Sequence, residues 1–597
     1  MSNSSVMKPR LIGGGSVVSR LLILLVLLPS CLLAQEEGTE HLGVPTDWSH
    51  RHMVFSPPGS PMEAFNLSGN PRYVQQWLRR TVERRRRRHG VIHKDWSQSM
   101  GTGATVGAGQ YPAKFSYDAT VDSCTNDFVA FNTGLAGAAG QASIIAYTNL
   151  YVGCPGPRTV PSVYWAYNTG GTISTSVTLS LDGSQLAFVQ AQGGVATLVL
   201  LKWQASTTET ATNPMSLTST GSYRGCTAPC MTTLTFTGTT PKDTYSSPYY
   251  DFTSGSDTLY VGDDAGFLHQ FTGVFSGTPA ESTTAPWPVK AGSAPLSGPV
   301  FDSTTGNVFV ATSFQTSNNG GRLQIICAIS PCAMGNNGNG PVAIGTVTPS
   351  GILGPDTTVN GNCRGTGASG NGSNLRLDAP IVDSTAGRVY VFLGNDGGGN
   401  SVVIQFPTAV SMTSYHSCPA ETTVGTGSTT GIPLFAGTFD NVYFTSSSGS
   451  SPSGNLYVCG NTTGNATLYQ VRITSNAMAA SGTSVLAVST GNTTCSPVTE
   501  VFSSSIDWIF LSVEALGSTS SPVLCPSNAG CLMSFKVPTT LGGTLPSGTT
   551  ATLATSGGTS GVVIDNTVAP GTLHTSQIYF STLTGGTAVQ ASQAALQ

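Results

Sequence analysis

Cysteine is the residue type in this chain whose number and spacing most directly predict chemistry. The chain has 13 cysteines, and one of them, Cys31, lies in an N-terminal apolar stretch. The other twelve can form six disulfides, and disulfides persist in oxidising compartments. Sequence alone does not fix the connectivity, but spacing favours the pairs Cys124–Cys154, Cys226–Cys230, Cys327–Cys332, Cys363–Cys418, Cys459–Cys495 and Cys525–Cys531.

The cysteines and histidines do not have the spacing of a metal or haem site. No pair has C-x-x-C spacing, and no histidine follows at the distance used in zinc fingers. The histidines His269, His416 and His574 lie in different units of the sequence. We therefore predict no transition-metal site and no covalently attached haem.

Two acidic turns are weak calcium candidates, because carboxylate and amide oxygens are the ligands that calcium prefers. They contain Asp263 and Asp264 in VGDDAG, and Asn395 and Asp396 in LGNDGGG. The alternative is that these residues only form tight hairpin turns, which favour Asp, Asn and Gly for their local hydrogen bonds and positive φ. Calcium is the one cofactor that the sequence leaves open.

A loop with two arginines is a candidate site for an anionic ligand. Arg364 and Arg376 lie in GNCRGTGASGNGSNLRLDAP, within a part of the chain that is poor in charge. Guanidinium groups bind carboxylates and phosphates bidentately. The alternative is that both arginines pair with nearby acids such as Asp378 and only stabilise the loop.

No catalytic motif accompanies these candidates. The sequence has no H-E-x-x-H helix, no phosphate-binding loop at a strand–helix junction and no G-x-S-x-G nucleophile elbow. We therefore name no catalytic residue and leave enzymatic activity open.

The elements that must position these residues belong to a repeat. Each copy has an apolar strand, a turn, a second strand and a third strand, and copies begin at Ser176, Ser247, Gly298 and Ala379. A repeat of roughly 40–70 residues with this pattern predicts an all-β chain folded as a β-propeller of four-stranded blades. We count eight blades, with seven as the alternative, and expect DNVYFTS from Asp440 to be an inner strand.

The ends of the chain predict how the ring closes. The last unit ends after three strands, and WSQSMG at Trp96 resembles the segment before the second blade. A strand at about 94–100 can therefore complete the final blade, which removes exposed sheet edges.

The segment YVGDDAGFLHQF from Tyr260 resembles the core of PQQ-like, or quinoprotein-type, propeller repeats. The resemblance covers most of residues 95–597 as a pattern, and it implies the fold. The chain lacks both the tryptophan docking motif and the adjacent cysteines of the quinoprotein dehydrogenases. It is most similar to poorly characterised secreted bacterial propellers, and fold alone does not give an activity.

The first hundred residues predict export and a tether. Residues 1–34 resemble a signal peptide with cleavage after Ala34, and a lipid anchor on Cys31 is the alternative. Residues 35–92 are predicted to be a flexible linker with a short basic helix, and 93–597 the propeller. The linker contains the run Arg84–Arg88, and thirteen of the 25 Lys and Arg residues lie in the first hundred positions. No later segment is long and apolar enough to cross a bilayer.

These features predict a protein of the periplasm, cell surface or extracellular space that acts as a monomeric binding or scaffolding module. Loops at one mouth of the channel would bind a protein, a polysaccharide or a small anionic ligand, and we expect no nucleic-acid partner. One alternative is an enzyme, either a degenerate quinoprotein or a polysaccharide lyase or hydrolase. The other is a structural or adhesive surface protein.

Overall fold

The repeated apolar segments form antiparallel strands that follow one another along the chain. We describe them in a computed structural model, in which the chain divides into the units Met1–His41 and Leu42–Gln597. All described residues belong to the second unit. They are residues 43–57, 69–81, 92–119, 121–151, 154, 161–238, 244–253, 255–284, 287–291, 294–312, 322–329, 343–344, 378–396, 399–409, 420–427, 432–503, 505–565 and 577–593.

Each copy of the repeat is an antiparallel meander. The strands of the first four meanders, in chain order, are β4 (Ala113–Ser116), β5 (Phe128–Asn132), β6 (Ile144–Thr148) and β7 (Ser162–Asn168); β8 (Thr172–Ile173), β9 (Thr178–Leu179), β10 (Gln185–Gln192), β11 (Val195–Lys202) and β13 (Cys230–Thr235); β14 (Tyr249–Asp251), β15 (Thr258–Gly262), β16 (Phe267–Thr272), β17 (Ala280–Glu281) and β18 (Val289–Lys290); β19 (Val300–Asp302), β20 (Asn307–Thr312), β21 (Arg322–Cys327) and β22 (Ala343–Ile344).

The later meanders repeat the pattern. Their strands are β23 (Ile381–Asp383), β24 (Arg388–Leu393), β25 (Asn400–Pro407) and β26 (Ala420–Thr426); β27 (Thr438–Phe439), β28 (Gly454–Thr462), β29 (Asn465–Thr474), β30 (Ala477–Met478) and β31 (Thr483–Ala487); β32 (Thr499–Ser503), β33 (Ile506–Val513), β34 (Cys531–Val537) and β35 (Ala551–Ala554); β36 (Val563–Asp565), β37 (Gln577–Ser581) and β38 (Thr587–Gln593). Two parallel pairs, Gly425 with Asn461 and Thr423 with Ser481, join the meander that ends at β26 to the next, so that the two form one ten-stranded sheet with β2.

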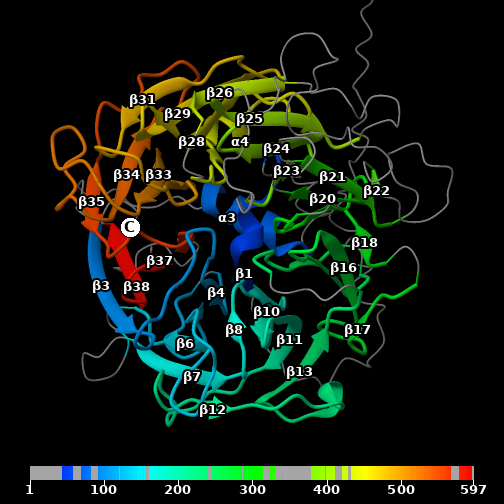
Figure 1. The fold of residues 1–597 in the computed structure, drawn as a ribbon. Helices are drawn as coiled ribbons and strands as arrows, with labels where there is room; N and C mark the ends of the chain where they lie inside the picture. Colours follow the sequence, from blue (N-terminus) through cyan, green and yellow to red (C-terminus); the bar gives the residue numbers. More distant parts are fainter. Residues whose placement is uncertain are drawn as a thin grey trace, which may run out of the picture. The chain divides into compact units, whose positions relative to one another are not determined.

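The meanders lie around a common centre, and first strands such as β4 and β23 lie on the side that faces it (Figure 1). This radial arrangement of antiparallel sheets is that of a β-propeller. Middle strands such as β20 and β33 are buried along almost all of their length. In β33, only Ile506 is not fully buried, which explains its almost uninterrupted apolar sequence.

An N-terminal strand pairs with the last strand of the chain. The strand β3 (Ile92–Ser99) runs antiparallel to β38, from Ile92 opposite Gln593 to Ser99 opposite Thr587. The pairing that we expected for residues 94–100 is therefore present, and it gives the final meander a fourth strand.

A serine or threonine before the first strand of a meander is a second repeated feature. Its hydroxyl oxygen accepts a hydrogen bond from a backbone N–H of the second strand after it. The pairs are Val189 N to Thr175, Gly262 N to Ser246, Ala311 N to Ser297, Ser512 N to Ser496 and Ser581 N to Ser560, at 2.8–3.1 Å. In these five sheets the bond ties the segment before the inner strand to the neighbouring strand, and the sequence pattern did not reveal it.

The expected strand DNVYFTS is wrong. Residues Asn441–Phe444 form the short helix α4, and only β27 before it is a strand. The Asp440 carboxylate accepts a hydrogen bond from Tyr443 N at 2.9 Å. It therefore acts as a helix N-cap, and this local bond competes successfully with the strand pattern.

Candidate functional site

Part of the predicted linker lies at the centre of the propeller (Figure 1). Its elements are β1 (Val44–Thr46), the 3₁₀ helix η1 (Trp48–Arg51), β2 (Met53–Val54) and α3 (Pro71–Thr81). We call residues 43–57 and 69–81 the N-terminal insert. Most of its side chains are buried, so the expectation of a flexible linker is wrong for these residues, whereas the expected short helix is present.

The two strands of the N-terminal insert extend sheets of the propeller at their inner edges. β1 pairs antiparallel with β4, from Val44 opposite Ser116 to Thr46 opposite Lys114. β2 pairs parallel with β23. Backbone groups that would otherwise face the channel are thereby hydrogen-bonded.

Trp48 fills the space between two other meanders. It is 2% exposed, and its Nε1 donates to Pro248 O at 3.3 Å. A Cβ atom added to Gly298 would lie 2.9 Å from Cη2 of Trp48. The first residue of the Gly298 repeat must therefore be glycine for the indole ring to fit.

Arg51 donates hydrogen bonds to backbone carbonyl groups of separate meanders. Its guanidinium donates to Ala436 O at 3.2 Å, to Gly437 O at 2.9 Å, and to Val498 O and the Tyr111 hydroxyl. Carbonyl dipoles that converge on one guanidinium stabilise the charge without a carboxylate partner.

The helix α3 adds three arginines to this centre. The guanidinium of Arg72 donates to Tyr250 O at 2.8 Å and lies 4.0 Å from the Tyr249 ring centroid. Arg79 donates to Glu500 O at 2.7 Å, and Arg80 pairs with the Glu500 carboxylate at 2.6 Å. Asn70 begins the helix, because its Oδ1 accepts from Arg72 N at 3.1 Å.

Burial controls protonation in this region. It lowers the pKa of His50 to about 3, with a further contribution from Arg79, and lowers that of His52 well below 6.5. Burial raises the pKa of Asp440 to about 6 and that of Asp507 well above its usual value, where Glu500 adds to the effect. Near neutral pH, both histidines are therefore neutral and the arginines carry the positive charge.

No protein-family model matches the chain, and no curated protein matches it. BamB from Moraxella catarrhalis is a similar solved structure, with 12% identity, a TM-score of 0.38 and coverage of 84% of this chain and 99% of that chain. Sqt1 from Chaetomium thermophilum has 9% identity, a TM-score of 0.44 and coverage of 84% and 98%. The WD40 domain of Toxoplasma gondii coronin has 12% identity, a TM-score of 0.32 and coverage of 66% and 76%. Likeness at these values carries no inference about activity or partner.

The predicted anion site is described only in part. Arg364 and Arg376 lie outside the described residues. The Asp378 carboxylate accepts hydrogen bonds from Ala379 N and Ala436 N, both at 2.9 Å, and lies 4.0 Å from Nε2 of His52. Burial raises the pKa of Asp378. Asp378 therefore connects the Ala379 and Ala436 backbones beside His52 of the insert, a position that the sequence did not suggest.

The calcium candidates lie in two separate hairpins. Asp263 accepts from Phe267 N at 2.7 Å in the turn between β15 and β16. Asp396 accepts from Asn400 N at 2.9 Å in the turn between β24 and β25. Asp264 and Asn395 are their chain neighbours. Among the described residues, no three His, Cys, Asp or Glu side chains are arranged so that they could hold a metal ion.

The structure contains a buried histidine between two carboxylates that the sequence analysis did not identify as a site. His269 Nδ1 lies 2.6 Å from Glu281 Oε1, and its Nε2 lies 3.3 Å from Asp263 Oδ2. Although burial lowers the pKa of His269, the hydrogen bonds to both carboxylates raise it overall. The only sequence signal is a histidine within the apolar strand FLHQF.

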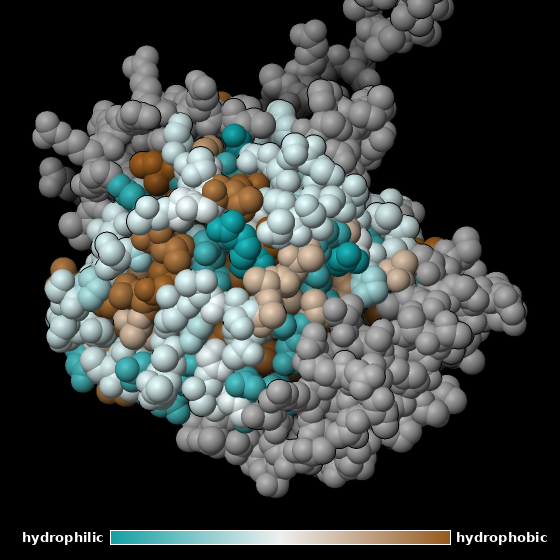
Figure 2. Space-filling model, turned by 90° about the horizontal axis from the view of Figure 1, so that it is seen from above, coloured by the Kyte–Doolittle hydropathy of each residue, from teal (hydrophilic) through white to brown (hydrophobic). Residues whose placement is uncertain are grey.

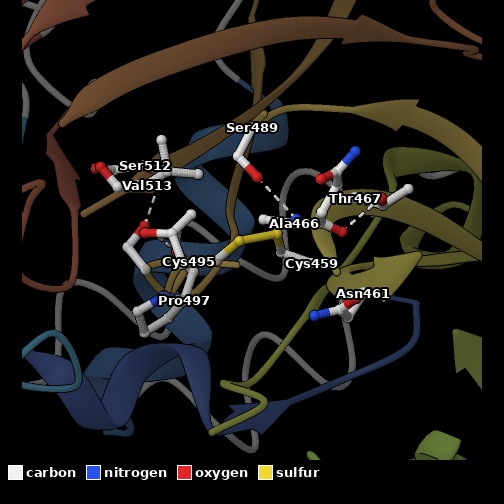
Figure 3. Close-up of a disulfide and its surroundings, with 12 residues drawn as sticks. Cys459, Asn461, Ala466, Thr467, Ser489, Cys495, Pro497, Ser512 and Val513 are labelled. Carbon is white, nitrogen blue, oxygen red and sulfur yellow. Dashed lines mark hydrogen bonds between the residues drawn. A yellow bond between two sulfur atoms is a disulfide. The ribbon is translucent and has the colours of Figure 1, made fainter. Parts of the chain in front are cut away.

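Four expected disulfides are present: Cys124–Cys154, Cys226–Cys230, Cys459–Cys495 and Cys525–Cys531. Cys332, Cys363 and Cys418, which belong to the other two pairs, lie outside the described residues. The Cys459–Cys495 bond links β28 to the segment before β32, beside the hydrogen bond from Ala466 N to Ser489 (Figure 3). This disulfide therefore joins two neighbouring meanders.

None of the helices in the described part of the chain is both long enough and apolar enough to span a membrane.

Proposed function

We propose that this protein is an exported propeller of eight blades, closed by β3, that acts as a binding or scaffolding module. The meanders support the blade count if the ten-stranded sheet, which contains β2 and the strands from β23 to β31, is counted as two blades that are joined only by short parallel contacts. We further propose that its repeats are of the PQQ-like kind. The phrase from Tyr260, which forms β15 and β16, is the residue pattern behind this proposal.

Export is supported by the N-terminal signal pattern and by the disulfides. Four disulfides among the described residues favour an oxidising compartment, such as the periplasm, the cell surface or the medium. Whether Cys31 carries a lipid or cleavage follows Ala34 is decided by the mass of the mature N-terminal peptide.

The single observation that carries the functional proposal is the occupied channel. Side chains and strands of the N-terminal insert contact inner segments from several meanders, including β4, β23 and β32. A ligand would therefore meet the outer loops of the propeller rather than the channel wall. Loops on a rigid scaffold are the usual location of recognition residues.

The loop between β33 and β34 is the best described candidate for such recognition. The Cys525–Cys531 disulfide constrains it, and Cys525 N donates to Ser518 O at 2.9 Å. Leu524 is 59% exposed, the largest exposure among the large apolar residues described. A braced loop that presents an apolar side chain loses little entropy on binding. Elsewhere, Figure 2 shows apolar patches among polar side chains on the face seen from above.

A binding screen tests the proposal. The oxidised mature chain is screened against glycans, small carboxylates and phosphates, and envelope proteins. A protein or glycan ligand is expected to lose about tenfold in affinity or more in Leu524→Asp. It should keep its affinity in Leu541→Asp, a matched control at a residue that is 45% exposed.

The same screen covers the anionic-ligand prediction. A carboxylate or phosphate ligand should be lost in Arg364→Ala and Arg376→Ala and retained in Leu524→Asp. The proposed function would be contradicted if no glycan, small anion or envelope protein bound. It would also be contradicted if a ligand bound with the same affinity to the wild type and to all of these variants.

A further inference from the structure

A buried lysine lies between two carboxylates from opposite ends of the propeller sequence. Lys114 Nζ in β4 lies 2.9 Å from Asp565 Oδ2, at the end of β36, and 3.6 Å from Asp127 Oδ2, just before β5. The side chains of all three are at most 1% exposed. The cluster therefore joins the first meander to the last.

The surroundings of this cluster hold it in place and exclude solvent. The Tyr151 hydroxyl donates to Asp127 Oδ2 at 2.5 Å, and the Tyr151 ring centroid lies 5.9 Å from Lys114 Nζ. The Ser116 hydroxyl donates to Asp565 Oδ2 at 3.0 Å, and Tyr579 is fully buried nearby. Such a wall both orients the groups and keeps out the water that would reverse a condensation.

Charge attraction favours the ammonium form of Lys114, because attraction to Asp127 and Asp565 outweighs burial and raises its pKa. Burial raises the pKa of Asp127, although Lys114 opposes it. A condensation needs the neutral amine and a neutral acid, and burial reduces the cost of that pair relative to the ion pair. The 2.9 Å contact lets the Lys114 proton pass directly to Asp565, which gives both neutral groups in one transfer.

We propose that Lys114 and Asp565 condense into an intramolecular isopeptide bond, with Asp127 as the positioning and proton-transferring carboxylate. The lone pair of the neutral Lys114 amine forms a bond to Cγ of protonated Asp565. Asp127 accepts a proton from the nitrogen and returns it to the departing hydroxyl group. The C–O bond breaks, one water leaves, and a secondary amide remains. No oxidant, reductant or co-substrate is required.

The bond would close the ring covalently. Lys114 lies in the innermost strand of the first meander and Asp565 in the innermost strand of the last, so the amide connects the two blades that sequence places farthest apart. Separation of these blades would then require cleavage of a covalent bond rather than loss of the β3–β38 pairing alone.

The experiment is mass spectrometry of the purified mature chain after full reduction and denaturation. The proposal predicts a mass lower by one water and, after proteolysis, a branched peptide in which the Lys114 and Asp565 side chains are joined. A full-length mass with separate Lys114 and Asp565 peptides overturns it and leaves a buried salt bridge only. Loss of water without the branched peptide, as in a succinimide, overturns it as well.

Substitutions at Lys114, Asp127 and Asp565 test the role proposed for each side chain. Lys114→Met should restore the full mass, and Asp127→Asn should prevent or strongly slow the condensation while Lys114 and Asp565 remain. Asp565→Asn should still cross-link, with loss of ammonia in place of water. Lys290→Met, at an exposed lysine, is the matched control and should remain one water lighter. Because every sample is denatured before measurement, a variant with reduced stability still gives a result.

Discussion

The blades and the N-terminal insert are both buried, but they are stabilised in different ways. A blade strand such as β33 packs apolar side chains on both faces, with Trp508, Ile509 and Phe510 fully buried. The insert also buries apolar side chains such as Trp48 and Phe55, but it adds arginine hydrogen bonds and short edge strands whose partners belong to separate meanders. A blade is therefore specified by its local sequence, whereas the insert requires several meanders to be in place.

The largest expected effect compares one tryptophan from each region. Trp48→Ala in the insert and Trp508→Ala in β33 should each lower the free energy of unfolding by about 3–5 kcal/mol, because both rings are buried and leave a cavity. Urea unfolding measures both. Trp77→Ala, at a residue that is 37% exposed, is the control and should cost about 1 kcal/mol or less. An unchanged midpoint for Trp48→Ala would show that the insert is not part of the folded unit.

The second comparison concerns the charged contact between insert and blade. Arg80→Met leaves the buried Glu500 carboxylate without its 2.6 Å partner and should destabilise the protein by about 3–5 kcal/mol. Glu500→Gln in the same chain should recover part of this loss, since the uncompensated charge is then removed. A double-mutant cycle measures the coupling, and strictly additive effects would argue against a direct pair.

A smaller effect is expected from steric conflict at the same boundary. Gly298→Ala places a methyl group against the Trp48 ring and should cost about 1–3 kcal/mol. Trp48→Phe should reduce that cost by removing the conflicting part of the indole. Gly221→Ala, where no atom lies within 4 Å of the added carbon, is the matched control. Equal stability of Gly298→Ala and Gly221→Ala would contradict the position of Trp48.

The effect expected to be smallest for a change of one pH unit is a pH dependence of the unfolding free energy. His50 has a pKa of about 3 when folded and 6.5 as its ordinary value, so it stays neutral in the folded chain and gains a proton on unfolding. Its contribution to stability is present above pH 6.5 and falls toward pH 3, by up to about 1.4 kcal/mol per pH unit.

The variant His50→Asn removes the contribution of His50 to the pH dependence of the unfolding free energy. Unfolding free energies of variant and wild type should converge as the pH falls below 6.5. Carboxyl groups such as Asp440, whose raised pKa of about 6 acts in the opposite direction, affect both proteins equally. His93→Gln, at a side chain that is 77% exposed, should not alter the slope. A constant gap between wild type and His50→Asn would show that His50 is exposed.

The sequence predicted those parts of the fold that depend on local pattern. Strand alternation, turn residues and cysteine spacing were sufficient for the meanders, for the β3–β38 pair and for four disulfides. The α4 helix was missed because the N-cap bond of Asp440 is not visible in the alternation of NVYF.

The contents of the channel could not be predicted in the same way. Arg51, Arg72 and Arg80 are read from sequence as solvated charges, since their partners at Ala436, Tyr250 and Glu500 are far along the chain. Asp378 and Lys114 acquire their roles by the same kind of long-range contact. The remaining anion and calcium candidates stay predictions.

Hydrogen–deuterium exchange of the intact chain tests the central claim most directly. If the N-terminal insert occupies the channel, amides of β1, β2 and α3 should be protected to a degree similar to those of the inner strands β4 and β23. Exchange of residues 43–57 and 69–81 within seconds, while β4 and β23 remain protected, would contradict the account.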